Sequence, residues 1–234
     1  MARADGPTWS WLDRMAPTTR RDLLARGALR VFAAKSRLVA EGDEATSVMI
    51  VRSGLVAVVR SGHDEHGIFM AFRGPFELVG EIGVLYEQPR VADVVALRGD
   101  PVQVWSYAAR RFLAFLDEHP DARRAAAWAA QQKLLAYQRR STRYGRGDAV
   151  QRVAHVLLDH ASEFGQVVDT SIAITVPLTQ QRIADLIGSA TDAVGGAFRR
   201  LKRAGAIRTG VGCNGRTLVL DRSVLVAFAD ARRR

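Results

Sequence analysis

The stretch LTQQRIADLIGSATDAVGGAFRRLKRAGAI, residues 178–207, sets the architecture of the C-terminal part of the chain. Its apolar residues recur at spacings of three and four, which predicts amphipathic helices over 179–187 and 190–204. Gly188 breaks the first helix, and we expect Ser189 to cap the second, with Asp192 reaching back to it. Two short helices joined by a tight glycine turn form a helix-turn-helix. An ordinary pair of packed helices has the same pattern and remains an alternative.

The outer face of the second predicted helix is polar and then basic. Thr191, Asp192 and Gly195 lie at its exposed start, where small residues let the backbone approach a DNA groove closely. The basic residues that follow fit phosphates, which position a protein without identifying bases. They are Arg199, Arg200, Lys202 and Arg203. Strand-like segments at 207–209 and 217–220 flank the sequence GVGCNG and predict a hairpin that serves as a wing.

Between Val31 and Tyr107 the chain is a series of short apolar runs separated by turn residues. Runs punctuated at intervals of about 8–12 residues predict a β-sandwich or a rolled sheet. The predicted strands are 31–34, 37–40, 47–51, 55–59, 68–72, 92–97 and 102–107. We expect the preceding residues 8–29 to be helical, with an interruption at Pro17.

A helical pattern follows Tyr107 and predicts a short helix over 108–118 and a long one over 121–144. Small and apolar residues along the long helix alternate spacings of three and four, the pattern of a two-stranded coiled coil. This seam consists of Ala127, Ala130, Leu134, Tyr137, Ser141 and Tyr144. We expect the seam to pair with a second copy of the chain, and packing on the chain's own sheet is the alternative. Basic residues, Lys133 among them, are assigned to the opposite side.

The sequence YGRGD, residues 144–148, interrupts the helical pattern and predicts a hinge between two domains. A helix over 149–163 and a strand over 172–176 are expected before the helix-turn-helix. A last helix is predicted over 221–231.

The segment GEIGVLYEQPRVADV, residues 80–94, breaks the alternation of the strand-rich region. It places Gly80 and Glu81 together and adds Arg90 ten residues after the glycine. One interpretation is a loop that folds around a small anionic ligand. The other is a solvated turn in which Glu81 and Arg90 pair with each other.

Composition narrows the class of protein. The chain has 234 residues, enough for two modest domains, and a net charge of +10 that favours polyanions, with nucleic acid first and an anionic membrane surface second. Its single cysteine, Cys213, excludes an internal disulfide, a four-cysteine zinc site and a thiolate-held iron–sulfur cluster within one chain. The sequence shows no signal peptide and no apolar run long enough to span a membrane, so we expect a cytoplasmic protein.

The strand-rich region, the long helix and the predicted winged helix-turn-helix together resemble the Crp/Fnr family of bacterial transcription regulators, over roughly residues 8–225. The resemblance implies an α+β fold with an N-terminal, jelly-roll-like β-roll. The implied domains are a cyclic-nucleotide-binding β-roll with flanking helices (1–120), a dimerisation helix with a hinge (121–146) and a winged helix-turn-helix that binds DNA (147–234). It further implies a homodimer on double-stranded DNA, RNA polymerase as a candidate partner, no membrane partner and no enzymatic activity.

Within this resemblance, the segment from Gly80 to Arg90 looks like the phosphate-binding cassette of cyclic-AMP-binding proteins. Arg90 would make a bidentate contact to the cyclic phosphate, and Glu81 would accept the proton of the ribose hydroxyl. Backbone N–H groups near Gly80, Ile82 and Val91 would hold the phosphate oxygens. The expected effector is therefore a cyclic nucleotide, with no covalent cofactor.

Two departures from the family pattern bear on ligand identity. Val91 replaces the Ser or Thr that often follows the cassette arginine, which favours cyclic AMP over cyclic GMP. Tyr137 and Gln138 occupy the positions of the long helix where the family contacts the base, in place of the usual Thr-Ser pair. Stacking of Tyr137 on a base is one interpretation, and plain packing in the seam is the other.

The predicted DNA surface departs as well. The family's common Arg-Glu…Arg set on the recognition helix is replaced by Thr191, Asp192 and Gly196, so we expect a different preferred operator. The predicted DNA-contacting residues are Thr179, Gln180, Gln181, Ser189, Thr191, Asp192, Gly196, Arg199, Arg200 and Lys202.

Other candidate sites are weaker. His63 and His66 flank two acidic residues, which is more typical of a solvated hairpin loop than of a metal site. His155 and His160, five residues apart on a predicted helix, do not share a face. We find no nucleophile–base pair, and we interpret Cys213 as incidental.

Two further hypotheses remain open. The same architecture with a degenerate pocket would bind DNA without a ligand, and the departures at Val91 and Tyr137 motivate this alternative. A nucleotide-sensing module whose basic surface binds a protein or a membrane is a hypothesis of a different class.

Overall fold

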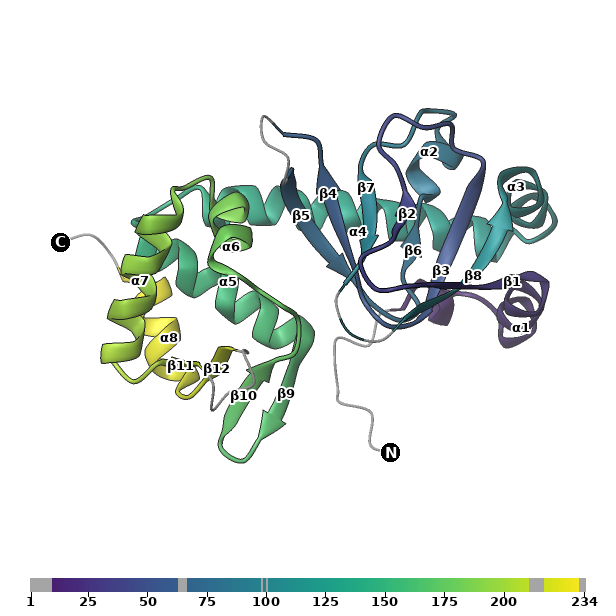
Figure 1. Ribbon diagram of the computed structural model, residues 1–234. Coiled ribbons are helices and arrows are strands. Elements are labelled where there is room, and N and C mark those ends of the chain that lie inside the picture. The colour runs from purple at the N-terminus through teal and green to yellow at the C-terminus, as the bar shows by residue number, and fades with distance from the viewer. Residues whose placement is uncertain (1–9, 63–66, 98, 100, 211–216, 232–234) are drawn as a thin grey trace. The chain divides into compact units, whose positions relative to one another are not determined.

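The computed structural model describes residues 10–62, 67–97, 99, 101–210 and 217–231. His63, His66, Cys213 and the tip of the predicted wing lie outside these residues. The chain forms two compact units, one that ends at Leu135 and one that begins at Ala136. Figure 1 labels their helices and strands.

The N-terminal unit is a rolled β structure of two four-stranded antiparallel sheets, with strand orders β1-β8-β3-β6 and β2-β7-β4-β5. Its strands are β1 (Ala28–Phe32), β2 (Arg37–Val39), β3 (Ser47–Ser53), β4 (Val56–Arg60), β5 (Ile68–Arg73), β6 (Leu78–Val79), β7 (Asp93–Ala96) and β8 (Val102–Ala108). Its helices are the 3-10 helix η1 (Trp11–Arg14), α1 (Pro17–Arg26), α2 (Glu81–Leu85) and α3 (Ala109–Glu118), together with the first part of α4 (Pro120–Tyr144). In Figure 1, α1 and α3 lie side by side at one end of the roll, joined by an ion pair of 3.0 Å between Arg26 and Glu118.

Strand β3 explains how the roll is stabilised. Val48 and Ile50 face a core shared with the helices, whereas Met49 and Val51 face a second core between the sheets. A strand covered on both faces requires apolar residues at every position instead of at alternate ones. This is why residues 48–51 form a continuous apolar run.

The start of the chain differs from the prediction of a helix over 8–29. Pro17 is the first residue of α1, where its missing N–H costs nothing, so η1 and α1 are separate helices. Helix α1 ends at Arg26, and Leu29 belongs to β1, which pairs with β8. Gly27 lies between α1 and β1 and packs closely on β8, where a side chain would not fit, because a Cβ there would lie 2.7 Å from Cβ of Trp105.

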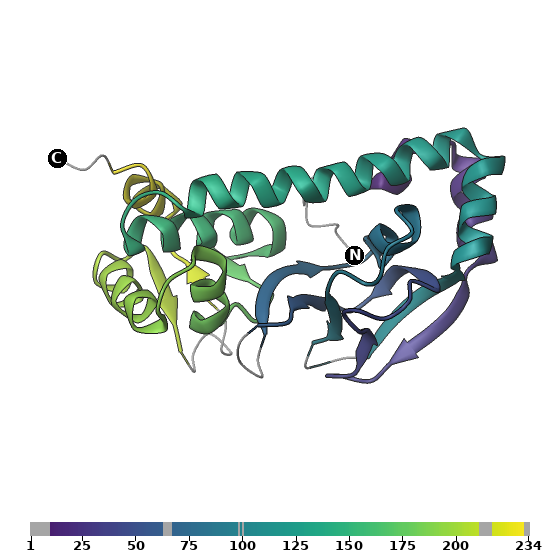
Figure 2. The ribbon, with the colours of Figure 1, turned by 90° about the horizontal axis from the view of Figure 1, so that it is seen from above.

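Helix α4 forms one continuous helix of 25 residues (Figure 2). A stripe of alanines along it packs on the N-terminal core: Ala122, Ala125, Ala126 and Ala129. Of the predicted seam, Leu134 is 57 % exposed and Tyr137 58 % exposed, and Ala127 and Ser141 are also exposed. The predicted coiled-coil contact is wrong at two seam positions, because Ala130 and Tyr144 are buried within the chain.

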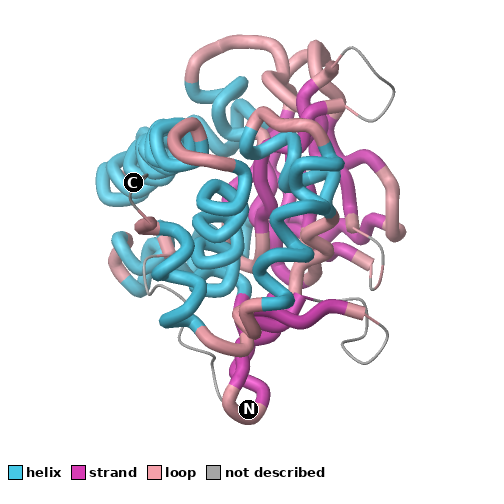
Figure 3. Tube along the Cα trace, turned by 90° about the vertical axis from the view of Figure 1, so that its left-hand side faces the viewer, coloured by secondary structure: helices cyan, strands magenta, loops and turns pink. Residues whose placement is uncertain are grey.

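The C-terminal unit combines helices with a small sheet, separated by colour in Figure 3. The helices are α5 (Ala149–Phe164), α6 (Gln180–Ile187), α7 (Thr191–Arg203) and α8 (Arg222–Ala229). The sheet has the order β11-β12-β10-β9, from β9 (Gly165–Val168), β10 (Ser171–Ile174), β11 (Ile207–Thr209) and β12 (Thr217–Val219). Asp148 starts α5 with a capping box to Gln151, so the predicted hinge runs directly into a fixed helix start. The predicted fold class is confirmed: a β-roll, a long helix and a winged helix-turn-helix.

Candidate functional site: a pocket in the roll and an exposed helix-turn-helix

The segment that follows β6 folds locally around Gly80. Gly80 has φ +79 and precedes the short helix α2, a conformation that suits a residue without Cβ. A Cβ at this position would lie 2.6 Å from Nη1 of Arg90, so the glycine is also required by close packing. The chain returns through Pro89 and Arg90 into β7. The predicted proximity of Gly80 and Arg90 is therefore present in the structure.

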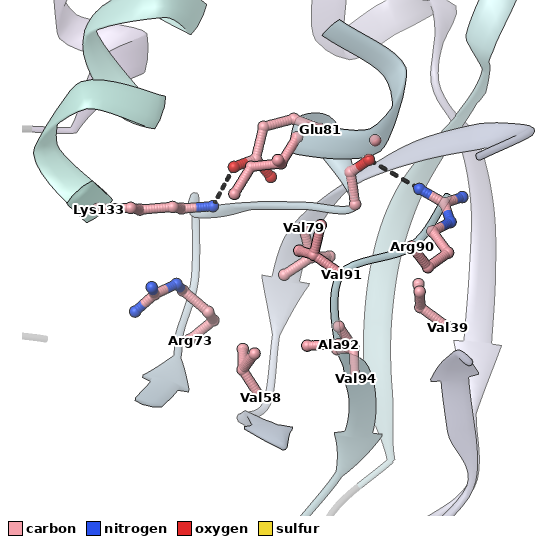
Figure 4. A pocket seen from close by; sticks show the side chains of 13 residues that line it. Val39, Val58, Arg73, Val79, Glu81, Arg90, Val91, Ala92, Val94 and Lys133 are labelled. Atoms are coloured by element: carbon pink, nitrogen blue, oxygen red, sulfur yellow. Dashed lines mark hydrogen bonds and ion pairs between the residues drawn. The ribbon is translucent and has the colours of Figure 1, made fainter. Parts of the chain in front are cut away.

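A small cavity of about 80 Å³ opens between this segment, the sheet and α4 (Figure 4). In this view Val58 and Val94 lie at its lower end, Glu81, Arg90 and Lys133 lie at its upper end, and Arg73 stands at the side below Lys133. The lining residues are Val39, Val58, Arg73, Val79, Gly80, Glu81, Ile82, Gly83, Arg90, Val91, Ala92, Val94 and Lys133. An apolar floor with a few convergent charges is typical of a ligand site.

Arg90 is the buried cation of this cavity, with 7 % of its surface exposed. Nη1 donates to the carbonyl oxygen of Gly80 at 2.7 Å, and Nη2 donates to the carbonyl oxygen of Ser47 at 2.7 Å and to Oγ of Ser47 at 3.2 Å. Burial lowers the pKa of Arg90, opposed by the charges of Asp43 and Glu81. An arginine remains protonated in proteins, so the guanidinium stays cationic. Three hydrogen bonds use at most three of its five N–H groups and leave donors for an anion.

Glu81 does not pair with Arg90, contrary to the second interpretation of this segment. Its Oε1 accepts from Nζ of Lys133 at 2.7 Å, and Nζ also donates to the carbonyl oxygen of Leu78 at 2.6 Å. In Figure 4, Lys133 points toward Glu81, whereas Arg90 is directed to a backbone carbonyl. The Glu81 side chain is 2 % exposed and that of Lys133 18 % exposed. Burial lowers the pKa of Lys133, and the Glu81 carboxylate opposes that shift.

Arg73 and Lys133 are the charged pocket residues that the sequence interpretation misses, and Lys133 is missed because the pattern of α4 assigns it to the outer, basic side of the helix. A signal was present in the sequence. Ala122, Ala126, Ala129 and Lys133 follow one another at spacings of four, three and four, so the lysine continues the buried alanine stripe.

The other predicted ligand residues divide into two groups. Ile82 and Val91 line the cavity, and Val91 is 44 % exposed. Tyr137 and Gln138 are exposed on α4 and are not part of the lining. Their contact to a base stays a prediction.

The ends of α6 in the helix-turn-helix are set by a side-chain cap at Thr179 and by Gly188, which has a left-handed backbone conformation. Thr179 caps α6, its Oγ1 accepting from the N–H of Arg182 at 3.2 Å. Gly188, at φ +58, ends α6, and the N–H of Ser189 donates back to the carbonyl of Ala184 at 3.0 Å. The prediction that Ser189 caps the second helix is wrong. Helix α7 begins one residue later than expected, so Ala190 takes the cap position and supplies no side-chain acceptor.

Helix α7 separates an apolar from a charged face as predicted. Val194, Ala197, Phe198 and Leu201 are buried. The exposed face carries Asp192, Arg199, Arg200, Lys202 and Arg203, with Gly196 half-buried between them.

The predicted contact residues at the start of α6 form a small network with α7. Oγ1 of Thr191 donates to Oε1 of Gln181 at 2.7 Å, and Nε2 of Gln181 donates to Asp185 at 3.0 Å. Gln180 is exposed beside them. These contacts fix the two helices against each other and leave the exposed face of α7 open.

Across the described ranges, no group of three or more His, Cys, Asp and Glu side chains is placed to hold a metal ion. None of the helices in the described part of the chain has the length and apolar character needed to cross a membrane.

Two family models match the chain. The cyclic nucleotide-binding domain matches residues 29–119, and the Crp-like helix-turn-helix domain matches residues 151–228. A CRP-like cAMP-activated global transcriptional regulator of Mycobacterium tuberculosis is 26 % identical over 176 residues, which cover 72 % of this chain and 75 % of that protein.

Solved structures share the fold. FixK2 from Bradyrhizobium japonicum has a TM-score of 0.72 at 19 % identity and covers 88 % of this chain and 99 % of its own. The regulator CLP of Xanthomonas campestris has a TM-score of 0.70 at 22 % identity and covers 88 % of this chain and 99 % of its own. With a cyclic nucleotide-binding domain followed by a Crp-like helix-turn-helix, the chain belongs to the Crp/Fnr family of transcription regulators.

Proposed function

We propose that this regulator is a homodimer whose affinity for double-stranded DNA is controlled by a cyclic nucleotide, with cyclic AMP the first candidate, bound in the pocket of Glu81 and Arg90. The observation that carries the proposal is the presence of a buried guanidinium and a buried carboxylate in one cavity with an apolar floor. A cyclic nucleotide offers one phosphate charge, a ribose hydroxyl and an apolar base, which are the complementary groups.

Each charged residue has a role that its contacts allow. Arg90 keeps N–H groups beyond those bound to Ser47 and Gly80, and these would receive the phosphate. Glu81 binds Lys133 through Oε1, and its second oxygen would accept the ribose hydroxyl. Lys133 would thus hold the carboxylate in place while the ligand is bound.

Dimerisation is supported by α4. Leu134 and Tyr137 are large apolar side chains, three residues apart on one face, and more than half of each is exposed. A second copy of the same helix would cover them in a two-stranded contact. A dimer would place two recognition helices in successive major grooves, with half-sites about 34 Å apart.

The test of the ligand site is the substitution Arg90→Leu, read by thermal unfolding with and without cyclic AMP. A ligand at 100 times its Kd stabilises a folded protein by about 2.7 kcal/mol, and we expect this stabilisation in the wild type and its loss in Arg90→Leu. Arg21→Leu is the matched control, because it removes the same charge from an exposed site on α1. Circular dichroism verifies that Arg90→Leu is folded at the start of the scan. Equal stabilisation of Arg90→Leu and wild type would remove Arg90 from the ligand site.

A second candidate is a regulator of the same fold that binds DNA without cyclic AMP. The small cavity, the carbonyl contacts of Arg90 and the Glu81–Lys133 pair favour it, because the chain's own groups already take up part of the hydrogen-bonding capacity of Arg90 and Glu81. The solved CLP of Xanthomonas campestris is described as responsive to c-di-GMP, so a cyclic dinucleotide belongs in the same titration. If only the cyclic dinucleotide stabilises the protein, the effector is a cyclic dinucleotide instead of cyclic AMP, and the pocket is still the ligand site.

The salt dependence of DNA affinity distinguishes a DNA-binding regulator from an interaction module whose basic surface binds a protein or a membrane. Binding of a duplex through phosphate contacts weakens steeply as salt rises, because counterions are released. An affinity for DNA that does not depend on salt would favour a protein or membrane partner for the basic surface.

A further inference from the structure

The recognition helix α7 contains two adjacent glycines, Gly195 and Gly196, on its exposed side. Each glycine in a helix interior costs roughly 0.5–1 kcal/mol relative to alanine. Neither has a left-handed φ that would require glycine. The absence of side chains at these two positions therefore calls for another reason.

The guanidinium of Arg199 lies over the gap that the glycines leave. A Cβ added at Gly195 would be 3.2 Å from Oε1 of Gln180 and 3.7 Å from Nη1 of Arg199, and one added at Gly196 would be 3.7 Å from Nη2 of Arg199. Helical side chains lean toward the N-terminus of their helix, so Arg199 is directed back over the preceding turn. The two terminal nitrogens thus span both glycines at van der Waals distance.

Arg199 also differs from its neighbour in what it contacts. Among the described residues, Arg199 has no hydrogen bond or ion pair, and it is exposed. The guanidinium of Arg200 lies over the ring of Phe228 on α8, 5.5 Å from its centroid. Arg200 is thus in contact with the body of the domain, whereas the planar group of Arg199 is open to a partner.

We propose that Arg199 reads a base instead of contacting a phosphate, by donating two hydrogen bonds to O6 and N7 of a guanine in the major groove. This inference rests on the proposed DNA binding, and it revises the phosphate role that the sequence suggested for Arg199. The gap at Gly195 and Gly196 lets the helix backbone and a flat guanidinium approach the base edges together. Guanine presents two acceptors whose spacing matches the two N–H groups of arginine.

Asp192 completes the same face. It lies seven residues before Arg199, two helical turns away, and its exposed carboxylate is an acceptor that a phosphate would repel. A cytosine N4 amino group is the base donor that suits it. The face therefore offers an acceptor, a gap and a guanidinium in sequence along the groove.

The experiment is selection of preferred sites from randomised double-stranded DNA by the full chain, with and without cyclic AMP, followed by affinity measurements on the selected site. The wild type is expected to select a guanine at one fixed position in each half-site. Arg199→Lys keeps the charge and loses the planar fork, so its discrimination at that position should fall by about 5- to 150-fold. Its affinity for unrelated duplex should remain unchanged.

Arg203→Lys is the matched control, since Arg203 is an exposed arginine on the last turn of the same helix and should keep the wild-type preference. Gly196→Leu is a second test. Leucine is the better helix former, so a loss of the guanine preference in this variant cannot come from weakened folding and would support the proposal.

Unchanged base preferences in Arg199→Lys, or in Gly196→Leu, would overturn the role of Arg199 while leaving DNA binding intact. A wild type that selects no sequence under either condition would overturn the proposed function, and this inference with it.

Discussion

Glu81 and Lys133 form a buried ion pair at 2.7 Å, in a pocket whose other walls are largely apolar. Two charges removed from water depend on each other, since neither has solvent to replace the partner. The pair also ties the cassette segment to α4 within the N-terminal unit. The contribution of this pair to the stability of the N-terminal unit can therefore be measured without any ligand.

Replacing Lys133 by methionine should destabilise the N-terminal unit by roughly 3 kcal/mol, because the Glu81 carboxylate would remain buried without its cation. Urea unfolding followed by tryptophan fluorescence measures this, since all four tryptophans (residues 9, 11, 105 and 128) precede Leu135. The double variant Glu81→Gln with Lys133→Met should recover part of the loss. If the single and double variants unfold at the same urea concentration as wild type, the pair does not contribute to stability.

At the residue scale, the sequence predicts the cassette better than its surroundings. The spacing of Gly80 and Arg90 follows from a local loop, and the structure brings them within hydrogen-bond distance. The partners of Arg90 and Glu81 come from Ser47 on β3 and Lys133 on α4, more than forty residues away along the chain. No local pattern specifies such contacts.

At the scale of elements, the sequence predicts long helices and strands from their periodicity, but it does not predict the short ones. The long strands and helices were predicted to within a few residues, and the fold class follows from them. Strand β6 has two residues, α2 has five and β9 has four, and all three were missed. Elements of this length contain at most two repeats of their period, too few to show a pattern, and pairing with β3 or β10 stabilises the two strands.

Leu134→Glu tests the proposed dimer contact of α4. Leu134 is exposed in the single chain, so a glutamate should leave the fold intact while placing two like charges in the helix pair. Sedimentation velocity should show a dimer for wild type and a monomer for the variant.

Arg139→Glu is the control for this substitution, as it changes the charge by two on the opposite side of the same helix and should remain dimeric. A Leu134→Glu protein that sediments as a dimer would mean that another surface holds the two copies together.

At the scale of the whole molecule, the two proposed binding sites lie in separate compact units. The sequence predicts a motif in each unit, because each motif has its own physical signature. Coupling between the two sites cannot be predicted in this way, since it depends on the free-energy difference between conformational states of the protein and not on any one contact. Binding at the two sites must then be reciprocal: a ligand that raises DNA affinity must itself bind more tightly when DNA is present.

The most direct test is the affinity for a selected operator measured by fluorescence anisotropy, without and with saturating cyclic AMP. We predict a change of about 5- to 150-fold, and the same factor in the affinity for cyclic AMP when the operator is bound. Equal operator affinities with and without cyclic AMP, in a protein that binds both, would contradict the claim that this pocket controls DNA binding.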